Sequence, residues 1–234
     1  GGELNQVVKP ASEVDVRMAL CYPDTYEVGM SHSGIRILYE VVNRREDAAA
    51  ERVFLPWTDA AGVMREENVV LATHESATPL TEFDLIGITL QHELTYTNVL
   101  EVLDLAGIAV RSGDRIGPDP LVVGGGPCAF NPEPVADFFD LIVIGDGEEA
   151  LDDLIDLFVE LPETLTDREG RSEQDRQALV RECAKIDGVY VPSLYTAREG
   201  AHGLQIAEPQ EPGVSERVTR RVVEDLDAQP WLTR

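Results

Sequence analysis

The sequence predicts an α/β fold: a Rossmann-like or flavodoxin-like parallel five-stranded sheet with helices on both faces, plus a small C-terminal α+β extension. Two observations predict it. Over the first 160 residues, short apolar segments alternate with segments whose apolar residues recur at helical spacing. The apolar segments are also nearly continuous, which is typical of parallel strands that are covered on both faces.

Five main strands are predicted, each followed by a break. They lie at residues 14–21, 52–55, 84–90, 121–123 and 141–144. The sequence DLIGITL in the third gives the clearest buried strand. Pro23 and Pro56 help to end the first two, because proline cannot donate a hydrogen bond to a sheet. Residues 69–73 are expected to form a further short extended piece.

Helices are predicted between these strands from the spacing of apolar residues. They lie at residues 34–44, 59–67, 98–106 and 148–161, the second being the weakest. In the first of them, Ile35, Leu38 and Val42 share one face. Gly107 follows the third as a C-terminal cap, a position that favours a residue able to adopt left-handed backbone angles.

We expect three regions along the chain. They are an N-terminal tail at 1–13, the α/β domain at 14–162 and an extension at 163–234. The expected elements of the extension are a helix at 176–184, a β-hairpin made of 188–195 and 203–207, and a strand at 215–223. The closing sequence EDLDAQPWLTR has little to bury, so we interpret it as a linker into a further domain.

The chain is strongly acidic, with 44 Asp and Glu against 19 Lys and Arg and a formal net charge of −25. Phosphate backbones are bound by Lys and Arg that displace counterions. Lysine occurs only at positions 9 and 185, so nucleic-acid binding by this chain is disfavoured. The acidity predicts a solvated surface, with a specific surface for a basic partner as the alternative.

Composition also bears on the compartment. The sequence has no run of about 18 apolar residues, so no membrane span is expected. Its N-terminus lacks the basic and apolar pattern of a secretory signal. The three cysteines, Cys21, Cys128 and Cys183, are widely spaced and make neither a disulfide framework nor a CxxC metal pair. We expect reduced thiols in a cytoplasmic protein, two of them buried beside strands.

Ligands of such sheets bind beyond the carboxyl ends of the strands. The functional rim is therefore expected in the loops at 23–33, 89–97, 124–134 and 145–148. The candidate cofactor-binding residues on this rim are Thr89, Gln91, Gly124, Gly125, Gly126, Pro127 and Gly145. We expect them to line one concave surface, and we predict no catalytic and no metal-binding residue in this chain.

The triple glycine at 124–126 directly follows a strand. Residues without a Cβ let the backbone turn sharply and approach a flat ligand closely, although a plain tight turn would need the same residues. The dinucleotide fingerprint is excluded because Pro127 and further prolines interrupt the helix that it requires. A phosphate loop is excluded because no Gly-Lys-Ser/Thr occurs.

The other rim motifs have simple structural interpretations. The stretch GDGEE at 145–149 opens a helix, and Asp146 or Glu148 is expected to cap it. These acids would repel a phosphate placed there. His32 and His92 are isolated histidines, and no HxxxH or HExxH metal motif occurs. No GxSxG is present, so a hydrolase triad is unsupported.

Taken together, these segments resemble a known family. VGGGPCAFNPEP and FDLIVIGDGEEAL resemble the signature of cobalamin-binding domains fused to radical S-adenosylmethionine (SAM) enzymes. YPDTYEVGMSHSGIRILYE and ITLQHELTYTN are more similar still to an uncharacterised bacterial family of such fusions. VTRRVVEDLDAQP is similar to the segment that leads into the radical SAM barrel there. The resemblance covers roughly residues 14–230.

The cobalamin-binding family carries D-x-H-x-x-G after its first strand. Here Met30 and Ile35 replace the Asp and the Gly around His32. The Asp would hold the second ring nitrogen of a ligating histidine, and the Gly would let the loop turn beneath the corrin. We therefore expect that His32 does not ligate cobalt.

The family's other two motifs are partly present. Thr89 stands where S-x-L has its Ser, Gln91 replaces the Leu, and Gly124 and Gly125 match the GG after the fourth strand. The resemblance therefore leaves two alternatives. A corrinoid binds without a protein histidine, or the domain has lost the cofactor and serves in docking.

For the whole protein, the resemblance implies a [4Fe-4S] cluster on CxxxCxxC that cleaves SAM. This chain lacks that motif, so we expect no SAM cleavage by it and a radical SAM domain of the same polypeptide as its partner. Three hypotheses follow: a cobalamin-binding accessory module, a cofactor-free substrate- or domain-docking module, and an unrelated FMN or nucleotide binder. Fold alone cannot choose among them.

Overall fold

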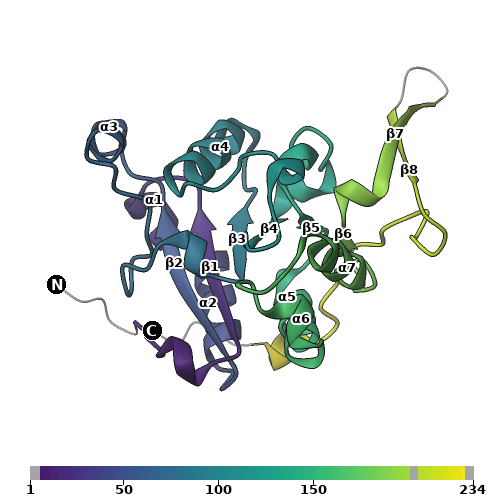
Figure 1. Ribbon diagram of the computed structural model, residues 1–234, viewed down its shortest axis with the longest axis horizontal. Coiled ribbons are helices and arrows are strands. Elements are labelled where there is room, and N and C mark those ends of the chain that lie inside the picture. The colour runs from purple at the N-terminus through teal and green to yellow at the C-terminus, as the bar shows by residue number, and fades with distance from the viewer. Residues whose placement is uncertain (1–5, 201–204, 230–234) are drawn as a thin grey trace.

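The computed structural model describes residues 6–200 and 205–229. Its centre is a six-stranded sheet in the order β2-β1-β3-β4-β5-β6 (Figure 1). The strands are β1 Val16–Tyr22, β2 Ala48–Phe54, β3 Leu85–Thr89, β4 Leu121–Gly125, β5 Leu141–Val143 and β6 Val189–Tyr190. The first five are parallel, and β6 pairs antiparallel with β5. The predicted α/β class is confirmed, in the flavodoxin-like order 2-1-3-4-5, with one strand more than expected.

Helices cover both faces of this sheet (Figure 1). One face carries α2 Ser33–Asn43, α5 Gly147–Glu160 and α7 Glu173–Cys183, and the other carries α3 Thr58–Glu67 and α4 Tyr96–Leu105. Gly107 follows α4 with a φ of +69°, as its position after a helix predicts. Within the described ranges, no helix is long and apolar enough to cross a membrane.

Side chains alternate between the two faces along each strand, which gives the protein two apolar layers. The layer under α2, α5 and α7 contains Met18, Leu20, Val123, Leu151, Leu154 and Leu179. The layer under α3 and α4 contains Phe83, Ile86, Val102, Leu103, Val122 and Phe139. Both layers are continuous from β1 to β5, so the sheet is buried on both faces as its apolar sequence predicts.

Two short helices fall outside the predicted elements. They are α1 Tyr26–Ser31 and α6 Glu163–Thr166. Neither is long enough to show a helical period in the sequence. Helix α1 lies against the end of β2, because a Cβ at Gly29 would come within 2.5 Å of the ring of Phe54. The first rim loop is therefore partly helical.

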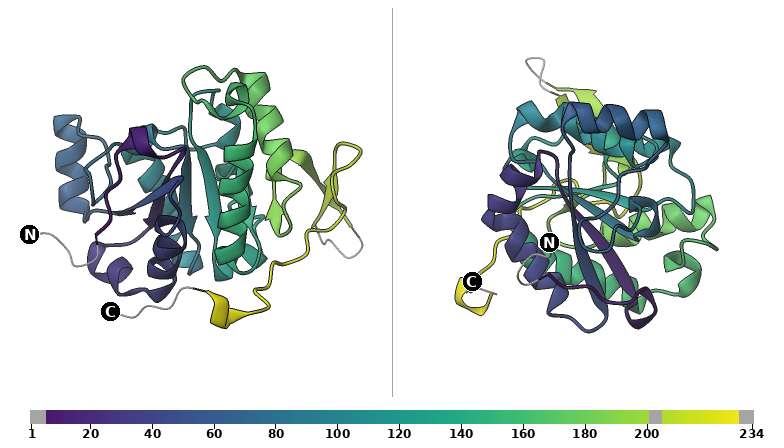
Figure 2. Two further views of the ribbon diagram at one scale, coloured as in Figure 1. Left: turned by 90° about the horizontal axis from the view of Figure 1, so that it is seen from below. Right: turned by 90° about the vertical axis from the view of Figure 1, so that its left-hand side faces the viewer.

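The C-terminal hairpin was predicted with the wrong first strand. Of the predicted residues 188–195, only Tyr195 belongs to the hairpin: β6 joins the main sheet instead, and its Val189 and Tyr190 are buried there. The hairpin consists of β7 Tyr195–Glu199 and β8 Gln205–Pro209, and it projects from the body of the molecule (Figure 2). The predicted 203–207 strand begins in residues outside the described ranges.

Two further extended segments form only isolated bridges. Residues 215–223 are not a strand, and their one bridge joins Arg221 to Gly145. Residues 69–73 likewise make one bridge, between Ala72 and Pro79. Apolar residues alone did not distinguish these segments from strands, because pairing depends on a partner edge that the local sequence does not encode.

A buried ionic network ties α7 to the sheet. Asp140, just before β5, lies between two arginines: its Oδ2 is 2.7 Å from Arg115 Nη1, and its Oδ1 is 2.9 Å from Arg176 Nη2. The same Oδ2 accepts a hydrogen bond from the amide of Val122 in β4. Arg171 donates to the carbonyls of Gly117 and Asp119 at 2.6 Å each. Burial lowers the pKa of Arg171 to about 10.

Replacing Asp140 by Asn should lower the free energy of unfolding by about 3–5 kcal/mol, because Arg115 and Arg176 stay buried without a carboxylate between them. Asp137→Asn is the matched control: it removes an exposed pair with Arg111 and should cost less than about 1 kcal/mol. Urea denaturation measures both. Equal losses in the two variants would contradict this role for Asp140.

Candidate functional site

A cavity of about 560 Å³ opens at the carboxyl ends of the strands, between the sheet and helices α2 and α5. We call it the slot. Its sheet side is lined by Met18, Leu20, Gly87, Val123, Gly125 and Val143. The helix side is lined by Ile35, Leu38 and Leu151, and the mouth by Thr89, Gln91, Gly126, Pro127, Phe130, Asp146, Glu148, Arg220, Arg221 and Val222. All seven candidate residues from the sequence line this one cavity.

The slot exists because two strand positions on this face lack a side chain. Gly87 follows Leu85 by two residues in β3, and Gly125 follows Val123 by two in β4, so both glycines face α2 and α5. A Cβ at Gly125 would meet only Val143 Cβ, at 3.9 Å. Gly125 therefore borders open space that a larger side chain would fill.

Gly87 was missed in the sequence, although a signal was present. A glycine inside a buried strand often marks the close approach of a ligand or another backbone. Here the side chain of Met18 reaches over Gly87, since a Cβ there would lie 2.6 Å from Met18 Cε. Methionine is flexible and fills irregular gaps. The bottom of the slot is therefore closed by a side chain that can change rotamer.

The three consecutive glycines have different roles. Gly125 alone opens on the slot floor. A Cβ at Gly124 would press against the ring of Phe139 at 3.1 Å on the other face of the sheet. Gly126 has a φ of +111°, and a Cβ there would lie 3.1 Å from the carbonyl oxygen of Leu90. The backbone path thus favours glycine at 126, as a plain tight turn would, whereas Gly124 gives room to packed side chains.

The mouth of the slot is polar. Gln91 Nε2 donates a hydrogen bond to Thr89 Oγ1 at 2.7 Å, so the two candidate side chains are held together at the end of β3. Asp146 and Glu148 bring carboxylates to the opposite side of the mouth. Asp146 occupies the expected N-cap position of α5 and Glu148 lies in its first turn, but the side chain of Asp146 makes no capping hydrogen bond.

Gly145 serves a backbone contact. Its φ is +110°, and a Cβ there would lie 2.1 Å from the carbonyl oxygen of Arg221. Arg221 N donates to Ile144 O at 2.8 Å, and Asp146 N donates to Arg221 O at 3.1 Å. The carboxylate of Asp146 accepts from Val223 N at 2.9 Å instead of capping α5. Gly145 thus leaves room for the segment at 221–223, a role that the sequence did not reveal.

The two rim histidines lie outside the slot lining. The ring of His32, between α1 and α2, packs on that of Tyr22 with centroids 5.2 Å apart. His32 Nδ1 is buried and has no hydrogen-bond partner among the described residues. His92 Nδ1 accepts from Leu94 N at 3.2 Å on the surface. That His32 does not ligate cobalt stays a prediction.

The three cysteines are free, and two of them are buried. Cys21 and Cys183 are buried, and burial raises the pKa of both thiols, that of Cys183 to about 12. Cys128 is half-buried. In the part of the chain that the structure describes, no three His, Cys, Asp or Glu side chains gather as a metal site.

Gly145→Ala should destabilise the protein through both backbone strain and a clash with Arg221, and it should displace the 220–223 segment. Gly213→Ala is the matched control, because Gly213 has a φ of +94° but no heavy atom lies within 4 Å of the place that its Cβ would take. Strain alone costs about 1–3 kcal/mol, so Gly145→Ala should exceed its control in urea denaturation. Equal costs would show that Arg221 does not press on Gly145.

Comparison with known proteins places the chain among radical SAM proteins. It is 26% identical over 132 residues to the uncharacterized protein MJ0966 of Methanocaldococcus jannaschii, a match over 56% of this chain and 24% of that protein. The chain thus spans about a quarter of that relative. The radical SAM methyltransferase TsrM of Kitasatospora setae aligns with a TM-score of 0.44 and 17% identity, over 84% of this chain and 30% of that one.

The family described as "Radical SAM proteins, N-terminal" matches residues 34–192. This range begins at the start of α2 and ends just after β6, so it contains most of the sheet and of the slot lining. The chain belongs to this family of radical SAM N-terminal regions.

Proposed function

We propose that the chain is an accessory module of a radical SAM enzyme and that its slot binds a corrinoid. The observation that supports this best is the slot itself, an apolar cavity at the carboxyl ends of parallel strands whose floor lacks side chains at Gly87 and Gly125. Ligand sites typically have volumes of about 300–1,000 Å³ and apolar walls with a few polar groups at defined places. The slot has these properties.

The residues present fit a flat macrocycle that carries an appended aromatic group. The backbone at Gly125 and Gly126 presents no side chain to a ring resting on the mouth. Thr89 and Gln91 would hold polar substituents of that ring through their hydroxyl and amide groups. The apolar walls at Leu38 and Leu151 suit an aromatic group inserted from above. A bound corrinoid would supply radical chemistry at its cobalt–carbon bond.

Cobalt would take no ligand from His32. Its ring packs on Tyr22, and its Cε1 edge approaches Gly34, where a Cβ would lie only 2.8 Å away. Met30 and Ile35 provide neither the carboxylate nor the glycine that supports a ligating histidine in the family motif. We propose that His32 would not act as a cobalt ligand for a bound corrinoid.

SAM cleavage belongs to another part of the polypeptide. Cys21 and Cys183 are buried, and the chain has no CxxxCxxC, so the [4Fe-4S] cluster and SAM would be held by a radical SAM domain that is the partner of this one. We propose that residues 14–162 carry most of the ligand site, to which residues 220–222 add one wall, and that 163–234 lead toward that domain, while α7 and β6 also pack on the sheet.

A cofactor-free docking role is the second candidate, and one observation favours it. Trp57, Leu94 and Phe130 follow the carboxyl ends of three strands and are 66%, 82% and 58% exposed. Large apolar side chains mark protein contacts where they gather into one patch, which is what the docking role proposes for these three. The FMN or nucleotide alternative is weaker, because Asp146 and Glu148 would repel a phosphate at the mouth.

Gly125→Leu should abolish corrinoid binding without unfolding the protein, because the new side chain enters open space in the slot. The probe is hydroxocobalamin, and the readout is the displacement of its visible absorption bands on titration with the purified chain. Gly62→Leu is the matched control: Gly62 lies on α3, and nothing is within 4 Å of its Cβ position. It should bind as the wild type does.

Two results would contradict the proposal. One is the absence of any spectral change with the wild-type protein, which would favour the docking role. The other is equal binding by wild type and Gly125→Leu, which would place the corrinoid outside the slot. Circular dichroism of each variant establishes that it is folded.

A further inference from the structure

One wall of the slot comes from a distant part of the sequence. The cavity is also lined by Arg220, Arg221 and Val222, of which the first follows the end of β5 by 77 residues. The chain reaches this place after leaving the hairpin and running back past one end of α5 (Figure 2, left, yellow). A segment that merely passed over the surface would not need specific contacts to hold it. This one has a set of contacts in three parts, which we call its seat.

The first part of the seat is backbone pairing. Arg221 takes the place of a strand residue beside the end of β5: its N donates to Ile144 O at 2.8 Å, and its O accepts from Asp146 N at 3.1 Å. Val223 N is satisfied by the carboxylate of Asp146 at 2.9 Å. The Val223 side chain is buried. The segment thus occupies a fixed register against the mouth.

The second part is a pair of glycines with positive φ. A Cβ at Gly145 would lie 2.1 Å from Arg221 O, and one at Gly188 would lie 2.9 Å from Arg221 Cβ. Gly188 comes just before β6 and Gly145 just after β5. Two separate loops therefore leave room for the same residue.

The third part is an ionic clamp on α5. Arg221 Nε is 3.1 Å from a carboxylate oxygen of Glu149, and Arg221 Nη1 is 2.8 Å from one of Asp153. These two acids lie four residues apart, on one face of the helix. Because α5 also supplies Leu151 to the slot, the clamp fixes the segment to a wall of the same cavity.

We propose that residues 220–222 are a working part of the binding site, and that Arg221 is the positioning residue that holds Arg220 and Val222 against the ligand. This inference rests on the proposed function, namely that the slot binds a corrinoid. Binding of residues 220–222 in their seat and binding of a ligand in the slot are then coupled. By linkage, the ligand must stabilise the segment by the same factor by which the segment strengthens binding.

The test compares Arg221→Ala with Arg65→Ala. Arg65 on α3 is the matched control, because its Nη2 is 2.8 Å from Glu101 and 2.8 Å from Asp104 on α4, the other face of the sheet. Both changes remove an arginine bound to two acids of one helix, so their effects on urea denaturation should be similar. Only Arg221→Ala should weaken hydroxocobalamin binding, by about 5-fold or more. Arg221→Lys, which can keep one ion pair, should fall between.

Amide hydrogen exchange supplies a readout that a merely structural role would leave unchanged. Hydroxocobalamin should slow exchange at Asp146, Arg221 and Val223 in the wild type, and less so in Arg221→Ala. Unchanged affinity in Arg221→Ala, together with unchanged exchange at these amides on ligand addition, would overturn the inference.

Failure of the proposed function would look different, because the wild type would then not bind hydroxocobalamin at all. In that case the second probe is 8-anilinonaphthalene-1-sulfonate, and its fluorescence is measured with wild type and with Gly125→Leu. The difference between these two signals is the part of the fluorescence that depends on the slot. A weaker slot-dependent signal in Arg221→Ala than in Arg65→Ala would support the coupling. Equal signals would overturn it.

Discussion

Close approach of backbone at the carboxyl ends of β3, β4 and β5 is the steric constraint on which the rest of this site depends. Gly124 meets the ring of Phe139, Gly126 meets the backbone of Leu90, and Gly145 meets that of Arg221. A Cβ would overlap the carbonyl oxygen of Arg221 at Gly145, and it would lie only 3.1 Å from its nearest neighbour at Gly124 and at Gly126. Where the same glycine pattern meets no neighbour, at Gly125, the unused volume becomes the slot. The close packing of these loops and the open volume of the slot therefore both result from the glycines at the strand ends.

The few basic residues of this acidic chain are largely engaged with its own acids and carbonyls. Arg115 and Arg176 share Asp140, Arg171 binds two backbone carbonyls, and Arg221 joins α5. Buried arginines of this kind specify how helices sit on the sheet at a considerable desolvation cost. Arginines held in this way are poorly placed to neutralise phosphates.

The sequence predicted what depends on local pattern and missed what depends on packing partners. The apolar segment at 84–90 and the helical spacing of Ile35, Leu38 and Val42 were sufficient for the layered α/β class. All seven candidate residues gather at one cavity because carboxyl ends of parallel strands share an edge. The role of Gly145 could not be predicted, since it depends on Arg221, which is 76 residues away.

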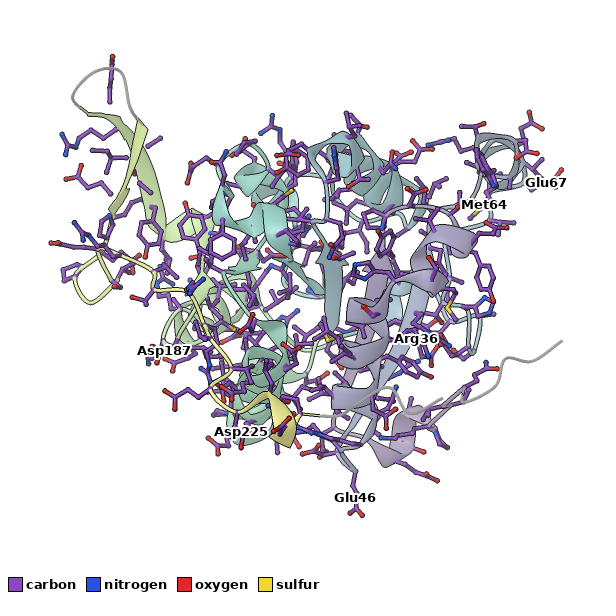
Figure 3. The ribbon with its side chains drawn as sticks, turned by 180° about the vertical axis from the view of Figure 1, so that it is seen from behind. Arg36, Glu46, Met64, Glu67, Asp187 and Asp225 are labelled. Carbon is purple, nitrogen blue, oxygen red and sulfur yellow. The ribbon has the colours of Figure 1, made fainter. Side chains whose placement is uncertain are left out.

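The central claim is that the slot is the ligand site, and its methionines allow a direct measurement. The chain has three, Met18 in the slot, Met30 packed against the same core layer, and Met64 on α3, on the opposite side of the view from the C-terminal turn with Asp225 (Figure 3). A carbon-13 methyl spectrum recorded during hydroxocobalamin titration should show the Met18 signal shifting and Met64 unchanged. A shift at Met64 with Met18 unmoved would contradict the account.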